Sequence, residues 1–212
     1  MAAVVVAGIW VSGGLITNDF GLAMALTAVW MGVALAGCLL IAWRRPGLRV
    51  AVLGAYLVTA VIVGGYLGRS TVFDDEVNER VVTVSPPSSA AQGGAPERDR
   101  PRNVLLGRGR FQPVAHSVSG TATTIRRAGG GNVLTLTDFE VDNGPDLRVY
   151  LVAGPARDES EVDDFVDLGA LKGNRGDQQY ELPRSLDLGR YSTVVIWCRA
   201  FSVNFARAPL AR

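Results

Sequence analysis

The chain contains few of the side chains on which most catalytic and metal sites depend. Its 212 residues include two cysteines and one histidine. Cys38 lies in a hydrophobic stretch, so Cys198 has no internal disulfide partner outside that stretch. The usual Cys-x-x-Cys signal of a zinc or haem site is missing. Ser117 and Ser119 lie on no recognisable nucleophile turn, which disfavours a Ser–His–Asp hydrolase. The composition therefore favours a protein that is not an enzyme on its own, although that question stays open.

An excess of positive charge is also missing. The formal net charge is +1, and Lys172 is the only lysine. Nucleic-acid binding needs Lys and Arg clustered on one face. The charge pattern therefore excludes nucleic acid as an expected partner.

Two N-terminal stretches, residues 21–43 and 50–67, contain no charged residue. About 20 apolar residues suffice for a helix to cross the hydrocarbon core of a bilayer. Neither stretch shows the polar stripe expected of a helix on a soluble protein. We therefore predict two membrane helices with the lipid bilayer as their partner. Residues 2–17 are also apolar, and their hydropathy favours a third helix. The segment is short, so an arrangement with two helices remains open.

The turn between the two predicted helices contains Arg44, Arg45 and Arg49. Cytoplasmic loops of membrane proteins carry such an arginine excess. We therefore expect a multi-pass protein of the plasma membrane whose residues after 68 lie on the extracytoplasmic side. Residues 69–105 are rich in Pro, Gly, Ser and charge around 85–102, which predicts a flexible linker.

Residues 106–212 show short runs of strand-forming residues separated by turn residues, with no long helical periodicity. The runs are 111–118, 120–127, 132–139, 147–152, 178–182 and 192–205. Three glycines followed by Asn132 predict a hairpin. Residues 191–205, which include Cys198, are rich in β-branched and aromatic types and are predicted to form one or two central strands. The pattern predicts an all-β domain, an antiparallel β-sandwich or a barrel-like module.

Several short motifs of this domain occur in the order of a known family. They are Leu136-Thr-Asp-Phe139, Asn143-Gly-Pro-Asp146, Val149-Tyr-Leu151, Tyr180-Glu-Leu-Pro183 and Val195-Ile-Trp-Cys-Arg199. Residues 106–212 thereby resemble the DM-thirteen, or electron-transfer DM, domain family. The resemblance implies a small extracytoplasmic β-rich domain with a cysteine near its C-terminal end and a role in electron transfer. Only Cys198 can inherit that role here.

Cys198 and His116 are the candidate redox and cofactor-binding residues. Strand alternation places Cys198 beside Val194 and Ile196, which favours burial and a raised thiol pKa. An inert core cysteine and a redox or metal contact both remain open. His116 could join Cys198 in a soft metal site or as a haem ligand, although a histidine satisfied within a strand is the favoured interpretation. The sequence identifies no specific cofactor.

Two polar loops are the candidate binding surface. The sequence places six polar residues in them: Asn143, Asp146, Lys172, Asn174, Asp177 and Gln178. Polar loops on a rigid sheet often carry binding residues, but Gly and Asn also serve turn geometry alone. The acidic run at 158–164 lacks calcium-loop spacing and is interpreted as solvated.

Two functional hypotheses follow. The first is a membrane-anchored extracytoplasmic domain with an accessory role in redox or electron transfer, centred on Cys198 and acting with a redox partner. The second is a non-catalytic binding or assembly module whose polar loops contact an envelope protein or a glycan.

Overall fold

The computed structural model describes residues 20–84, 102–156 and 162–212. Two apolar helices come first. Helix α2 spans Phe20–Arg44 and α3 spans Arg49–Val72, and the 3-10 turn η2 at Pro46–Leu48 joins them. The predicted helices at 21–43 and 50–67 are therefore confirmed as helices. The proposed third helix at 2–17 lies outside the described residues.

Both helices leave large apolar side chains exposed to their surroundings. Val29, Val50 and Val61 are each more than 60% exposed. The segments Ala25–Arg44 and Pro46–Tyr66 are long and apolar enough to cross a membrane. Exposed apolar surface of this extent marks a site of contact with a membrane or another protein.

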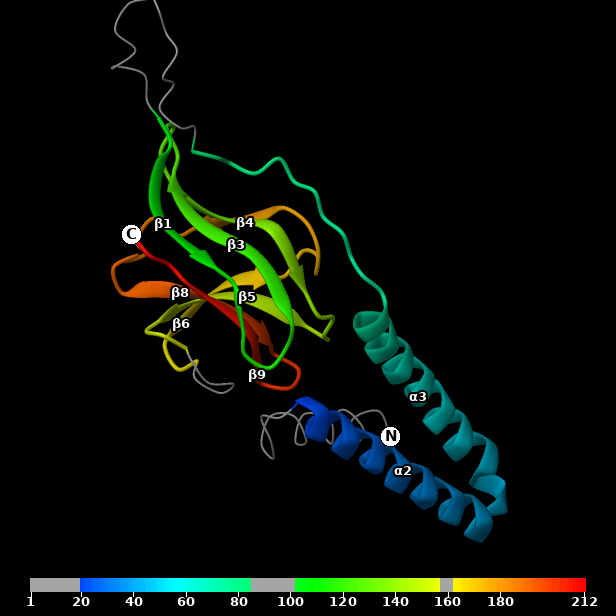
Figure 1. Cartoon of the computed structure of the whole chain (residues 1–212). Coiled ribbons are helices and arrows are strands. Elements are labelled where there is room, and N and C mark those ends of the chain that lie inside the picture. Colours follow the sequence, from blue (N-terminus) through cyan, green and yellow to red (C-terminus); the bar gives the residue numbers. More distant parts are fainter. Residues whose placement is uncertain (1–19, 85–101, 157–161) are drawn as a thin grey trace, which may run out of the picture.

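The C-terminal domain consists of two antiparallel sheets packed face to face (Figure 1). The four-stranded sheet has the order β1-β3-β4-β7, and the five-stranded sheet has the order β2-β9-β8-β5-β6. The strands are β1 Val104–Arg110, β2 Gln112–Pro113, β3 Val118–Arg126, β4 Asn132–Val141, β5 Leu147–Ala153, β6 Phe165–Ala170, β7 Gln178–Leu182, β8 Tyr191–Cys198 and β9 Val203–Pro209. The domain is thus the sandwich form of the two predicted architectures.

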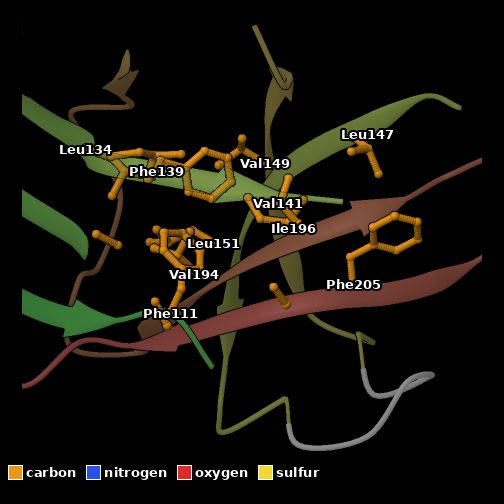
Figure 2. Packing of buried hydrophobic residues seen from close by; sticks show 14 of the residues in the cluster. Phe111, Leu134, Phe139, Val141, Leu147, Val149, Leu151, Val194, Ile196 and Phe205 are labelled. Carbon is orange, nitrogen blue, oxygen red and sulfur yellow. The ribbon is translucent and has the colours of Figure 1, made fainter. Parts of the chain in front are cut away.

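The core lies between the two sheets. Strand alternation turns Leu134 and Leu136 of β4 toward Leu151 of β5 and Ile196 of β8. Figure 2 shows Leu134, Leu151 and Ile196 together with Phe139 between the layers. All five are at most 2% exposed. Burial of such side chains is the main favourable term in the stability of a domain of this size.

The C-terminal strand pair occupies the middle of the larger sheet, as predicted from the run at 191–205. That run forms the two strands β8 and β9, which pair with each other, while β8 also pairs with β5. The predicted hairpin at Gly129–Asn132 is also confirmed, because β3 and β4 meet there with Arg126 opposite Asn132. Strands β1 and β6 have no counterpart among the predicted runs.

In the expected flexible linker, residues 69–105, the first part is ordered in the structure. Residues 69–72 are the last turn of α3, and the chain after them is hydrogen-bonded to the β domain from Asp75 to Val82. The side chain of Asn103 donates to the carbonyl oxygen of Thr83 at 2.9 Å. Because polar groups of the domain bind this backbone, residues 74–83 form an ordered strap along the domain. The Pro- and Gly-rich residues 85–101 lie outside the described part.

Candidate functional site

The strap, residues 74–83, lies beside the loop that precedes β7. We name residues 171–177 the docking loop. The N–H of Val77 donates to the carbonyl oxygen of Arg175 at 2.9 Å, and the N–H of Glu79 donates to that of Asp177 at 2.8 Å. Glu76 and Arg175 form a parallel β-bridge. The strap therefore adds to the docking loop in the manner of a short extra strand.

The docking loop is itself fixed by the end of β4. The N–H of Val141 donates to the carbonyl oxygen of Asn174 at 2.9 Å, and the N–H of Gly176 donates to that of Phe139 at 2.8 Å. Asp138 has a positive φ of 50°, and its N–H donates to a carboxylate oxygen of Asp177 at 2.9 Å. The loop is therefore held between β4 on one side and the strap on the other.

Two glycines of the docking loop allow the strap to approach closely. A Cβ atom at Gly173 would lie 2.4 Å from the carbonyl oxygen of Asp75, and one at Gly176 would lie 2.1 Å from that of Val77. Both distances are shorter than any ordinary contact. Glycine is needed here because the two backbones lie against each other.

Asn174 anchors the start of the strap. Its side-chain NH₂ donates to Asp74 at 2.9 Å and to the carbonyl oxygen of Val141 at 3.2 Å, while its side-chain oxygen accepts from the N–H of Asp75 at 2.7 Å. Asn174 is 6% exposed. Because this buried amide is hydrogen-bonded at both its NH₂ and its oxygen, it holds Asp74 and Asp75 of the strap next to Val141 of β4.

Asp74 is held by three side chains of the domain. Besides Asn174, it accepts a hydrogen bond from Asn143 at 2.8 Å and lies 3.1 Å from the guanidinium of Arg175. These partners, Asn174 first, lower the pKa of Asp74 below its ordinary value. The carboxylate is therefore held in its charged form at neutral pH.

Glu79 anchors the other end of the strap. Its carboxylate accepts from the ammonium of Lys172 at 2.7 Å and from the N–H of Gln179 at 2.9 Å. These contacts, Lys172 first, lower the pKa of Glu79. Lys172 also donates to the carbonyl oxygen of Gln179 and lies over the ring of Tyr180. The only lysine of the chain thus holds the strap.

Gln178 fixes the shape of the docking loop from within. Its side-chain oxygen accepts from the hydroxyl of Tyr180 at 2.7 Å and from the N–H of Lys172 at 3.1 Å. Its NH₂ donates to the carbonyl oxygen of Gly173 at 2.8 Å. Gln178 is fully buried, so it supports the loop and does not present a surface group.

Two clefts open beside the strap. One of about 200 Å³ is lined by Asn143, Asp146, Lys172 and Asn174 together with Phe73 and Asp75. The other, of about 390 Å³, is lined by Asp74, His116, Glu140, Asp142 and Arg175 among others. The two predicted polar loops therefore meet at one place, which we name the docking face: the strap, the docking loop and these two clefts.

Cys198 lies in the core between the sheets, next to the loop 143–146 that lines the smaller cleft. It is fully buried, and its thiol donates to the carbonyl oxygen of Pro145 at 3.0 Å. Burial raises the pKa of the Cys198 thiol to about 12. A thiol of this kind is almost entirely protonated at neutral pH and is a poor nucleophile.

His116 lies at the edge of the larger cleft. Its ring stacks on Phe205 with a centroid distance of 3.7 Å, and its Nδ1 lies 3.4 Å from a carboxylate oxygen of Asp142. Within the described residues, no group of three or more His, Cys, Asp or Glu side chains is arranged to hold a metal ion. The geometry therefore gives no support to a joint metal site of His116 and Cys198.

The remaining candidates have local roles. Asp146 accepts a hydrogen bond from Arg199 at 2.6 Å beside the smaller cleft. In the acidic run, residues 157–161 lie outside the described part, and Asp164 accepts from the hydroxyl of Tyr191 at 2.8 Å. The sequence reasoning missed Asp74, Glu79 and Arg175, because the ion pairs Asp74–Arg175 and Glu79–Lys172 join residues that lie about 100 positions apart in the chain. The only local signal was the β-type run at Val81–Val84 after the acidic residues.

The β domain is the part of the chain that matches a known family. Residues 110–210 match the family model described as Electron transfer DM13. The C-terminal part of the chain is a DM13 domain. A search of curated proteins found no match, and a search of solved structures found none either. The match supports a redox-related role for the DM13 domain and assigns that role to no residue.

Proposed function

We propose that this protein is a membrane-anchored binding module of an extracytoplasmic redox system, and that its docking face makes the functional contacts. The DM13 family match supports a redox-related role. The two long apolar helices support anchoring in a membrane. The gathering of both polar loops around the strap carries the proposal, because it forms a polar surface with two clefts on a rigid sandwich.

The extracytoplasmic placement rests on charge and chain order. Arg45 and Arg49 flank the turn η2, and α3 then runs for 24 residues, or about 36 Å, before the strap begins. A helix of that length spans a hydrocarbon core of about 30 Å. Arginines on the cytoplasmic side therefore put the strap and the DM13 domain on the opposite side.

Direct thiol chemistry is the weaker alternative for the redox role. A thiol that exchanges electrons through a disulfide must form a thiolate and be reached by its partner. Cys198 has none of its surface exposed to solvent, so a partner cannot reach it. Its raised pKa also opposes ionisation. We therefore assign Cys198 a packing role and assign partner contact to the docking face.

The test is photo-crosslinking in membranes of the native host, with a photoreactive residue at Glu140, which is exposed and lines the larger cleft. We expect a crosslinked envelope or redox protein. The Cys198→Ser variant should retain this product, and the Asp142→Asn variant should reduce it. A product that is lost in Cys198→Ser and kept in Asp142→Asn would overturn the proposal.

A further inference from the structure

The strap contributes little to the core of the domain. Glu76 and Asn78 are exposed, and Val77 and Glu79 are only half-buried. The buried core clusters contain no strap residue within the described part of the chain. The strap is therefore held by polar contacts and a few backbone hydrogen bonds, which places it among the segments that open before the rest of a domain unfolds.

The contacts of the strap define a recognition pattern. The first strap carboxylate that the domain binds is that of Asp74, through Asn143, Asn174 and Arg175. The last strap carboxylate that the domain binds is that of Glu79, through Lys172 and the N–H of Gln179. In an extended chain the two positions lie about 16 Å apart. The pattern is two carboxylates separated by four residues.

The middle of the strap is bound to the domain through its backbone. The N–H groups of Val77 and Glu79 bond to the docking loop, and Gly173 and Gly176 leave room for the strap carbonyls. Among the described residues, the side chain of Glu76 has no partner in the domain and accepts a hydrogen bond from Asn78 of the strap itself. The side chain of Glu76 is therefore free to vary, whereas the side chains of Val77 and Asn78 lie close to Gly173 and Gly176.

Strand β7 gives a second reason for a peptide site here. It forms the edge of the four-stranded sheet, and Gln179 of β7 bonds to the strap through its N–H to Glu79 and its side-chain oxygen to Val82. Uncovered sheet edges pair with extended segments of other chains. Displacing the strap would thus expose an edge together with two sets of carboxylate-binding groups.

We propose that the docking loop and the β7 edge form a binding groove for an extended acidic peptide with the pattern Asp-x-x-x-x-Glu. The strap is the resident ligand of this groove, and an acidic segment of a partner protein competes with it. This inference deepens the proposed function, on which it rests, by naming the chemical class of the partner.

A ligand tethered to its own site has the advantage of a high effective concentration. For short linkers this concentration is on the order of millimolar. A free peptide of the same sequence should therefore bind the wild-type chain weakly. Binding should strengthen once the strap can no longer occupy the groove.

The experiment uses the full chain in lipid nanodiscs and a fluorescent peptide that copies residues 73–84. In one variant, residues 74–79 are replaced by alternating Gly and Ser; in a second, Asp74→Asn is combined with Glu79→Gln. Both should bind the peptide at least tenfold more tightly than the wild type. Adding Lys172→Ala should abolish the gain. Near-ultraviolet circular dichroism checks that each variant is folded.

Two matched controls isolate the recognition chemistry. The Glu76→Gln variant also removes a strap carboxylate, but one without a partner in the domain, so its peptide affinity should equal that of the wild type. A peptide with Asn and Gln in place of the two end carboxylates should not bind. If neither folded strap variant binds the peptide more tightly than this control peptide, the groove proposal is wrong.

The two proposals can fail separately. Absence of peptide binding with a retained crosslink at Glu140 would refute the groove and leave the binding module. Peptide binding without any crosslinked partner would mean that the groove holds the strap alone, and it would refute both the competing partner segment and the binding module.

Discussion

Cys198 and the docking loop are the two regions that the sequence marks as chemically distinctive, and the fold treats them in opposite ways. Cys198 is surrounded by apolar side chains between two sheets. The docking loop lies at a sheet edge, and its Lys172 and Asn174 side chains bind carboxylates of the strap. The contrast teaches that a rare residue type is not by itself a sign of function. The surroundings decide what its chemistry can do.

The largest expected effect concerns the thiol. A pKa of about 12 leaves roughly three thousand times less thiolate at neutral pH than an ordinary cysteine with a pKa near 8.5. In a Cys38→Ala background, labelling of Cys198 by a maleimide should therefore be at least about a thousandfold slower in the folded than in the unfolded protein. Labelling at comparable rates in the two states would remove the distinction between the two regions.

The second effect concerns the core that surrounds the thiol. Phe139 is 2% exposed and packs its ring against Phe111 at a centroid distance of 5.0 Å. Phe139→Ala should lower the free energy of unfolding by about 3–5 kcal/mol, because it leaves a cavity. Urea unfolding followed by circular dichroism measures this. A loss below about 1 kcal/mol would mean that the sheets do not pack as described.

The third effect concerns the strap. Gly173→Ala places a methyl group against the carbonyl oxygen of Asp75, whereas Gly129→Ala meets no atom within 4 Å. The first variant should lose hydrogen-exchange protection at the amides of Val77 and Glu79. Because it loses the hydrogen bonds of these amides, its free energy of unfolding should fall by about 1–3 kcal/mol. The Gly129→Ala control should keep both. Equal protection in the two variants would show that the strap does not lie on Gly173.

The smallest effect is the pH dependence of the strap. Asp74 and Glu79 have lowered pKa values in the folded chain, so their contribution is complete above the ordinary carboxyl values and disappears as pH falls through the lowered ones. The strap should therefore stay docked from about pH 8 to 5 and open below about pH 4. The chemical shifts of the Asn174 side-chain amide report it. Opening between pH 7 and 5 would contradict this assignment.

The sequence predicted the layers of the molecule better than its polar contacts. The helices, the sandwich and the central strand pair follow from hydropathy and from β-forming residues such as Val194 and Ile196, which are local properties. The strap could not be predicted in the same way. Its bonds join Asp74 to Asn174 and Glu79 to Lys172, and only the tertiary fold brings such distant residues together. Its composition is also that of a solvated linker.

The candidate residues show the same division. Asn143, Lys172 and Asn174 were selected for their polarity in turns, and they do meet at the docking face. Gln178 was selected on the same ground but is buried as a support of the loop. Polarity alone did not separate a residue that contacts the strap from one that holds the loop in place.

The most direct test of the account is a disulfide between the strap and the docking loop. Glu76 and Arg175 are bridge partners, and paired backbones about 5 Å apart suit a disulfide. We expect Glu76→Cys with Arg175→Cys, in a background where Cys38 and Cys198 are alanine, to form an intrachain bond on mild oxidation. The product should migrate as a monomer without free thiols. Two thiols that remain free, while the domain stays folded, would contradict the account.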